Sequence, residues 1–518
     1  MKDKVITIVG GGASAVALIG SILDKVSKYE RTERLKIFVI EKRSQLGPGA
    51  AYAEDADSNL LNTRAGFITP FVNKPGDFYE WLSGNRALWE DDFPQISLSA
   101  DGFLPRPLFG KYLSHTFQRL RNRAVSLGCE IVPINGEATA LSFTHDGRIV
   151  VTAEGSIAFP SDHVVLSCGN GATREFAHLE DKPGFLPSPY PIKRLARRID
   201  QDARVAVIGT RLSAIDAVLG LNKSGHRGPI TMHSRHGALP SVRGTQGRYE
   251  PTILTLAFVQ RHVAQHGAIR LDEAIKWIGR EMVAAGVTER PTDLTALCRQ
   301  PVPAEFLARE IKASEGPRPW QAVLYATNAV IDFIWSNMPD EERRKFWPYM
   351  SWWMAYRVSI PAENAIKLLD RMEARRLDVY SGPIDVSHDG RCFQVEVSSQ
   401  SEICRFAYDA VVVGTGTPRD VRQIECPLVQ RLLSEGIATP HGFGGVQIAE
   451  ATGALIDAQG VADERITVLG ELTSGAYFFT SVLEINARHA HRRAETILQR
   501  LTPQQAETPW PSRIRLSA

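Results

Sequence analysis

The sequence has almost no net charge and no long apolar run. Its 60 basic residues are balanced by 58 acidic residues, which leaves a formal net charge of +2. A balance of this kind offers no broad positive field to a nucleic acid. No stretch is long and apolar enough to span a bilayer. We therefore expect neither a nucleic-acid partner nor a membrane partner.

Clustered cysteines are also missing. The six cysteines are Cys129, Cys168, Cys298, Cys392, Cys404 and Cys426. None belongs to a Cys-x-x-Cys pair, so the spacing indicates neither a redox-exchange dithiol nor a metal site, and we predict no bound metal. The chain passes from Met1 into a buried-strand pattern without the apolar region and cleavage site of a signal peptide. A cytoplasmic location is therefore expected.

The sequence contains two copies of one pattern, which consists of a strand, a glycine-rich turn and the start of a helix. Residues 5–15 read Val-Ile-Thr-Ile-Val-Gly-Gly-Gly-Ala-Ser-Ala, and the next strand ends at Glu41. Glycines let the backbone approach a pyrophosphate, which the helix N-terminus attracts. An acid at the end of the second strand accepts hydrogen bonds from a ribose 2′-hydroxyl. This first pattern predicts an FAD site.

The second copy ends in the opposite charge. Residues 204–214 read Arg-Val-Ala-Val-Ile-Gly-Thr-Arg-Leu-Ser-Ala, and the following strand meets Ser234 and Arg235. A basic group at this point suits the 2′-phosphate of NADPH. Arg211 stands where the middle glycine is usual, and its side chain should hinder a pyrophosphate. The alternative is a domain kept for packing, with Arg211 and Arg235 as solvated charges.

A repeat organises the chain around these two patterns. Each is followed by a hairpin around His-Asp-Gly-Arg, at residues 145–148 and 388–391, and then by an apolar strand that ends in glycine. The pattern predicts an α/β fold with two Rossmann-like dinucleotide-binding domains. We expect a discontinuous FAD-binding domain over residues 1–185 and 405–518, and an NADPH-binding domain over 186–404. A helical insertion is expected at about 250–370.

The candidate cofactor ligands follow from these patterns. Those expected to contact FAD are Gly10, Gly12, Ser14, Ala15, Glu41, Lys42, Gly49, Tyr52, Asn62, Arg106, Gly169, Gly470 and Thr480. Those expected to contact NADPH are Gly209, Arg211, Leu212, Ser213, Ser234 and Arg235. The helix start near Thr480 can face the flavin N1–C2 edge and stabilise negative charge there.

Seven short motifs keep the order found in the YdhS-like group of FAD/NAD(P)-binding proteins, which this chain resembles over most of its length. They lie at residues 47–52, 60–62, 75–82, 105–113, 225–230, 234–240 and 470–485. The known enzymes of that group include flavin monooxygenases that N-hydroxylate amino acids, notably converting aspartate to nitrosuccinate. The resemblance implies such an activity here. The chain departs from the motifs of that group at two points, which bear on nucleotide geometry and substrate choice. Arg211 replaces a glycine, and Arg357-Val-Ser359 replaces an Arg-x-Arg.

The preferred hypothesis is an FAD-dependent, NADPH-using monooxygenase that hydroxylates an amino acid or small amine through a C4a-(hydro)peroxyflavin formed with O2. Such chemistry needs a dry pocket and a positioned substrate more than acid–base groups. A substrate carboxylate would need guanidinium partners, for which Arg64, Arg243 and Arg357 are the candidates. Asn62 is the fourth candidate positioning residue. A structural ion pair is the alternative for each arginine.

Two other hypotheses stay open at this point. One is a flavin dehydrogenase or oxidase without oxygen transfer. The other is a non-catalytic redox sensor or interaction protein that binds flavin and NADP and docks through its helical insertion. The sequence leaves the substrate and the oligomeric state undetermined.

Overall fold

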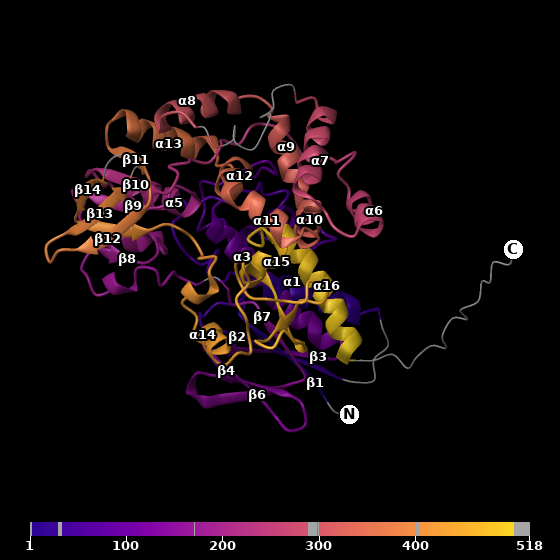
Figure 1. Ribbon diagram of the computed structural model, residues 1–518. Coiled ribbons are helices and arrows are strands. Elements are labelled where there is room, and N and C mark those ends of the chain that lie inside the picture. Colours follow the sequence, from indigo (N-terminus) through magenta and orange to yellow (C-terminus); the bar gives the residue numbers. More distant parts are fainter. Residues whose placement is uncertain are drawn as a thin grey trace.

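Two parallel sheets form the frame of the protein (Figure 1). The computed structural model describes residues 3–28, 34–169, 171–287, 298, 300–398 and 403–501. Each sheet carries helices on one face and a three-stranded antiparallel sheet on the other. The predicted α/β fold with two Rossmann-like units is confirmed.

The first sheet has the strand order β16-β17-β7-β1-β2-β3, and only the β16–β17 pair is antiparallel. Its strands are β1 (Lys4–Val9), β2 (Leu35–Glu41), β3 (Cys129–Asn135), β7 (His163–Leu166), β16 (Ala454–Ile456) and β17 (Ala462–Val468). One face is covered by α1 (Ala13–Val26), α3 (Arg106–Ser126) and α16 (Leu483–Leu501). The other carries β4 (Ala138–Phe143), β5 (Ile149–Ala153), β6 (Ile157–Ser161) and α14 (Pro427–Ser434).

The second sheet is parallel throughout and has the order β11-β10-β9-β15-β8. Its strands are β8 (Phe185–Leu186), β9 (Val205–Ile208), β10 (Ile230–Ser234), β11 (Leu377–Ser381) and β15 (Ala410–Val413). Helices α4 (Leu195–Arg198), α5 (Leu212–Lys223), α8 (Pro303–Ser314) and α13 (Ala362–Glu373) pack on one face. The other face carries β12 (Ile384–His388), β13 (Phe393–Ser398) and β14 (Ile403–Tyr408).

The boundary between the units differs from the expected one. Residue 405 lies inside β14, and β15 pairs with β9 of the second sheet. The chain therefore returns to the first unit only after Val413, because the apolar strand 410–413 completes the second sheet. At the other crossover, β8 already pairs with β15, so the second unit includes Phe185. Of the expected first unit, residues 502–518 lie outside the described residues.

Most of the connection between β10 and β11 is helical, in the region where the insertion is expected. Besides α8 and α13 it contains α6 (Leu256–His266), α7 (Leu271–Ala284), α9 (Pro319–Ala326), α10 (Ile331–Ser336), α11 (Asp340–Phe346) and α12 (Met350–Arg357). Trp277, Trp335 and Trp353 centre an aromatic core, which also includes Phe478 and Phe479 of the first unit. Figure 1 shows α10 and α11 beside α15 (Ser474–Tyr477) and α16. The insertion therefore packs against the first unit.

Among the described residues, no helix has the length and apolar content needed to cross a membrane. The short helix α2 (Asp77–Gly84) packs on α3 through Phe78 and Trp81.

Candidate functional site

The first glycine turn is too closely packed to hold side chains. Gly10 has a φ of +98°, and a Cβ there would lie 2.6 Å from the carbonyl oxygen of Ser167. A Cβ on Gly12 would lie 3.3 Å from the Cα of Gly49. Helix α1 begins at the next residue, Ala13, so its first N–H groups face this turn. The turn fits the cradle that a dinucleotide pyrophosphate requires.

Glu41 lies beside the same turn. Its carboxylate is buried, and Oε2 accepts a hydrogen bond from the N–H of Gly11 at 2.9 Å, while Oε1 accepts one from the N–H of Arg43 at 3.0 Å. These bonds hold the acid at the end of β2, next to the start of α1. This is the position from which a carboxylate reaches a ribose hydroxyl.

The strand end at Gly470 closes the first site from the C-terminal side. Gly470 has a φ of +76°, and a Cβ there would lie 3.4 Å from Oγ of Ser14. A Cβ on Gly169 would lie 2.8 Å from the backbone nitrogen of Leu472. Residues from three distant parts of the chain thus meet around the N-terminus of α1, as expected for an FAD site.

Two residues expected to contact FAD have partners within the protein. Lys42 forms an ion pair with Glu137 at 2.7 Å. Arg106 donates from Nη1 to Asp216 at 2.7 Å and to the hydroxyl of Tyr190 at 3.1 Å, which ties the first unit to the second. Guanidinium and ammonium groups form strong hydrogen bonds with carboxylates, and Asp216 and Glu137 supply them to these two side chains.

Tyr52 and Thr480 also have protein partners. The Tyr52 ring packs edge-on against Phe109, with the ring centroids 4.8 Å apart. The Thr480 hydroxyl donates to Glu471 at 3.2 Å. Burial raises the pKa of Glu471, although the nearby Arg419 opposes this shift. Glu471 falls inside the motif at residues 470–485, yet nothing in that motif alone indicates that a buried carboxyl group lies beside the site.

The second glycine turn is built like the first. Gly209 has a φ of +122°, and a Cβ there would lie 2.6 Å from the carbonyl oxygen of Gly414. Arg211 precedes the first residue of α5, and its Nη2 donates to the hydroxyl of Ser351 at 2.8 Å and to the Ser351 carbonyl. The side chain that replaces the usual glycine is thus held by α12. Leu212 packs against the core of the second unit, and Ser213 opposes the effect of burial, which raises the pKa of Tyr190.

Positive charge gathers at the end of β10. The hydroxyl of Ser234 hydrogen-bonds to Thr210 at 3.0 Å and accepts the N–H of Gly237 at 3.0 Å, which joins this loop to the glycine turn. Arg235 is exposed beside it. Burial, with the charges of Arg419 and Arg235, lowers the pKa of Arg211 to about 10. The site therefore has the field that a 2′-phosphate needs.

Arg243 and Arg357 converge on one aromatic ring. The guanidinium carbons lie 4.1 Å and 5.5 Å from the ring centroid of Tyr325, and that of Arg357 lies 4.9 Å from the ring of Phe479. Arg243 also approaches the backbone oxygen of Asn62, at 3.5 Å. Three of the four candidate substrate residues are thus brought together where the first unit meets the helical insertion.

The two guanidinium groups shift the ionisation of each other and of the ring. Burial, reinforced by the charge of Arg243, lowers the pKa of Arg357 to about 10. Burial would raise the pKa of Tyr325, but the charge of Arg243 and a hydrogen bond with Thr63 outweigh it, with Arg357 adding to them, and the pKa is lowered. An anion entering the cluster would be stabilised by both guanidinium groups.

The polar atoms of this cluster are only partly satisfied within the described residues. Nε of Arg243 and Nε of Arg357 are both buried there without a hydrogen-bond partner. Nη2 of Arg357 donates to the side-chain oxygen of Asn328, whose amide donates to Glu484 at 3.2 Å. A buried donor without a partner is costly, so the cluster favours a ligand that supplies acceptor oxygens.

Arg64 lies outside this cluster. It donates to the backbone oxygens of Gln246 at 2.9 Å and Gly244 at 3.2 Å, and pairs with Asp101 at 3.3 Å. These contacts join the segment that holds Asn62 to the second unit. Arg64 therefore positions neighbouring backbone, and its guanidinium has less to offer a substrate.

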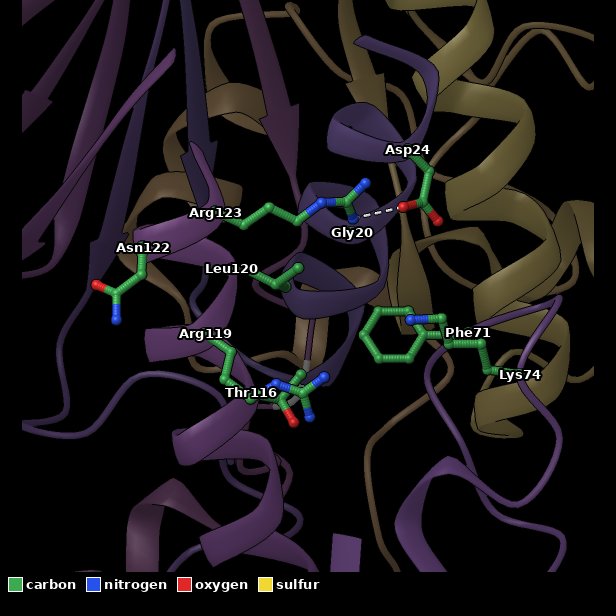
Figure 2. A pocket seen from close by; sticks show the side chains of 9 residues that line it. All are labelled: Gly20, Asp24, Phe71, Lys74, Thr116, Arg119, Leu120, Asn122 and Arg123. Atoms are coloured by element: carbon green, nitrogen blue, oxygen red, sulfur yellow. Dashed lines mark hydrogen bonds and ion pairs between the residues drawn. The ribbon is translucent and has the colours of Figure 1, made fainter. Parts of the chain in front are cut away.

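A cavity of about 440 Å³ lies elsewhere, between α1, α3 and the segment around Phe71 (Figure 2). In Figure 2 the side chains of Arg123 and Asp24 point toward each other, and the two form an ion pair at 2.5 Å. The Phe71 ring fills the space above Gly20, where a Cβ would lie 2.4 Å from the ring. None of the residues that line the cavity belongs to the sites described above.

A comparison with protein families assigns the first unit. Residues 7–171 match the model of the FAD-NAD(P)-binding family. The first unit contains an FAD/NAD(P)-binding domain. No curated protein matches the sequence. The finer resemblance to the YdhS-like group stays a prediction.

Solved structures with the same fold cover almost the whole chain. Reduced ornithine hydroxylase from Pseudomonas aeruginosa matches with a TM-score of 0.57 and 14% identity, over 97% of this chain and 100% of that one. The Kutzneria sp. 744 ornithine N-hydroxylase with reduced FAD, NADP+ and L-ornithine gives 0.52 and 14%, over 97% and 100%. The FAD-bound cadaverine monooxygenase from Erwinia amylovora gives 0.52 and 11%, over 100% of both chains. At these identities the likeness shows the fold.

Proposed function

We propose that this protein is an FAD-dependent, NADPH-using monooxygenase that N-hydroxylates an amino acid or a small amine with a carboxylate. The observation that carries this proposal is the pair Arg243 and Arg357 on the ring of Tyr325, next to Asn62. Two guanidinium groups with unsatisfied buried donors match a carboxylate. Ornithine and cadaverine hydroxylases share the fold, which supports the reaction class.

Bound FAD would supply the electron transfer and the oxygen transfer. Glu41 would accept hydrogen bonds from its ribose, and the N-terminus of α1 would bind its pyrophosphate. The closeness of Ser14 to Gly470 brings the end of β17 to the same place, so residues there would also help to hold the cofactor. The family match over residues 7–171 supports this assignment.

NADPH would bind at the second glycine turn. Arg235 is exposed at the end of β10, where the nucleotide 2′-phosphate of a Rossmann-like domain lies. Because Ser351 binds the guanidinium of Arg211, the space at the turn depends on α12 as well as on the turn itself. The second unit and its insertion would therefore share the task of holding the cofactor.

The residues of the chain would position the substrate and keep water out. Arg243 and Arg357 would hold its carboxylate, which leaves the amine to point toward the flavin as a neutral nucleophile. Phe478 is buried and has a φ of +69°, a conformation that non-glycine residues rarely adopt. This strained backbone presents Phe479 to Arg357. The aromatic core behind it excludes water from the reaction.

The test is turnover by the purified full-length protein. The bound flavin is first identified by its absorbance spectrum after purification. NADPH consumption is then measured with a panel of amino acids and amines, and hydroxylated product and hydrogen peroxide are quantified by mass spectrometry and a peroxidase assay. We expect one carboxylate-bearing amine to accelerate NADPH consumption and to yield one hydroxylated product for most of the NADPH consumed.

Two outcomes would contradict the proposal. Reduction of the flavin by the substrate without NADPH would instead indicate a dehydrogenase or oxidase. Protein that binds flavin but oxidises no NADPH with any of these compounds would favour a sensor or interaction protein.

A further inference from the structure

Two segments join the two units, and they lie side by side. The outgoing segment, described over 167–169 and 171–184, follows β7, and the returning segment 414–426 precedes α14. Thr173 and Ile424 form an antiparallel bridge, Arg174 N–H donates to Gln423 at 2.8 Å and Glu425 N–H donates to Ala172 at 3.0 Å. We call this pair of segments the linker ribbon. Every covalent connection between the units passes through it.

A cysteine lies on each segment at the end nearest the FAD site. Cys168 belongs to the loop after β7, and its backbone nitrogen would lie 3.1 Å from a Cβ on Gly10. Cys426 is the residue before the first turn of α14. The two thiols are 258 positions apart in the sequence, yet they lie close enough for each to shift the pKa of the other, and both are free. They also pack in one apolar cluster.

The surroundings make one of the two sulfurs the better nucleophile. The neighbouring thiol of Cys168, the N–H of Val429 in α14 and the nearby ammonium of Lys42 all favour the thiolate of Cys426, and the pKa of Cys426 is lowered although burial and Glu137 oppose this. The pKa of Cys168 is raised by the neighbouring Cys426 and by burial. A thiolate next to a protonated thiol is the arrangement in which a reactive cysteine has a resolving partner.

We propose that Cys168 and Cys426 form a reversible disulfide that closes the linker ribbon at its FAD end. The oxidant is hydrogen peroxide. The Cys426 thiolate attacks one peroxide oxygen, the O–O bond breaks, and hydroxide leaves to take up a proton as water. Cys168 then attacks the sulfenic sulfur of Cys426, and its proton and the sulfenic hydroxyl leave as a second water. Two thiols are oxidised and one peroxide is reduced to two waters.

The disulfide would restrain both units together. It closes a loop that contains the entire second unit, which lowers the entropy of the unfolded chain. It would also fix the ribbon, which any movement of the second unit relative to the first would have to bend. This consequence rests on the proposed function, because a fixed ribbon would slow any shift that brings the nicotinamide to the flavin.

The first test is chemical and needs no turnover. Full-length protein is treated with hydrogen peroxide, the remaining thiols are alkylated, and peptides are mapped by mass spectrometry without reduction. We expect a linked peptide pair containing Cys168 and Cys426, its loss after dithiothreitol, and a higher melting temperature for the linked form. Cys168→Ser should leave Cys426 as a sulfenic acid that dimedone traps. Cys404→Ser, on β14, should link normally.

The second test measures the rate at which NADPH reduces the bound flavin, in stopped flow, before and after peroxide. We expect a rate about tenfold lower in the oxidised wild type, restored by dithiothreitol, and no change in Cys426→Ser or Cys426→Ala. Full alkylation of both cysteines after peroxide would overturn the disulfide, whether or not the protein is a monooxygenase. A linked protein that is reduced at the original rate would overturn the restraint alone.

Discussion

Arg243 and Arg357 point their guanidinium groups at the same ring, that of Tyr325, at 4.1 Å and 5.5 Å from its centroid. Arg243 follows the loop after β10, and Arg357 ends α12, so 114 positions of sequence separate them. Like charges held this close repel each other unless an anion or a π face lies between them. The ring offsets part of the repulsion, and a carboxylate would offset more.

Arg64 should matter for stability rather than for substrate choice. Its guanidinium binds two backbone oxygens of the second unit, so Arg64→Ala should lower the free energy of unfolding by about 1–3 kcal/mol. Urea denaturation measures this loss. The ratio of kcat/KM between an amino acid and its amine should stay near the wild-type value. A selective loss of amino-acid turnover in a variant of full stability would assign Arg64 to the substrate.

Arg235 should select NADPH over NADH. Its exposed guanidinium stands where the 2′-phosphate of a bound nucleotide would lie, and a charged hydrogen bond contributes about 1.5–3 kcal/mol. Arg235→Ala should therefore raise the KM for NADPH by about tenfold or more and leave that for NADH nearly unchanged. Steady-state kinetics with both cofactors measures the difference. Equal effects on both would defeat the 2′-phosphate assignment.

Asp216 should be needed to keep the two units together. It is buried and accepts hydrogen bonds from Arg106 at 2.7 Å and from Tyr190 at 2.5 Å. Asp216→Asn leaves the Arg106 cation without its charge partner, which should cost about 3–5 kcal/mol in the free energy of unfolding. The exposed pair Asp202–Arg227 offers a control, because Asp202→Asn should change stability by less than about 1 kcal/mol.

Glu281 should make the helical insertion sensitive to acid. Burial opposes ionisation, but hydrogen bonds from Leu254 N–H and the hydroxyl of Tyr249, among others, outweigh it and lower the pKa of Glu281 from 4.5 to about 2. A lowered pKa in the folded state contributes stability above the unfolded pKa, and this contribution is lost as pH falls through the folded pKa. The excess stability of wild type over Glu281→Gln should thus hold at pH 5–7 and shrink from about pH 4.5 to about 2.

Urea denaturation at several pH values measures this difference. The exposed Glu305, near the start of α8, gives the matched control, and Glu305→Gln should match wild type at each pH. A stability gap that does not change between pH 6 and pH 3 would contradict the assignment of Glu281.

The nucleotide turns could be predicted from the sequence because their chemistry is local. The first turn, Gly10 to Ala15, with Glu41 behind it, follows from the spacing of a strand, a turn and a helix. The repeated hairpins likewise predicted two similar sheets. The unit boundary was harder, because 410–413 is an apolar strand that could pair with either sheet, and only the pairing of β15 with β9 decides it.

The side-chain partners could not be predicted in the same way. Arg106 lies in a motif that suggests a cofactor contact, but Asp216, which binds it, is 110 positions later on another unit. Tyr325 sits in a helix without any motif, so the sequence gives no sign that two arginines converge on it. The Cys168–Cys426 contact depends on the linker ribbon, and the absence of a Cys-x-x-Cys pair says nothing about it.

The central claim is that Arg243 and Arg357 bind the carboxylate of an amine that the enzyme hydroxylates. The most direct measurement compares kcat/KM for the best amino acid with that for its decarboxylated amine, in wild type and in Arg357→Gln, with Arg248→Gln as the control. We expect wild type and the control to favour the amino acid, and Arg357→Gln to lose about tenfold to a hundredfold of that preference. An unchanged preference in Arg357→Gln would contradict the claim.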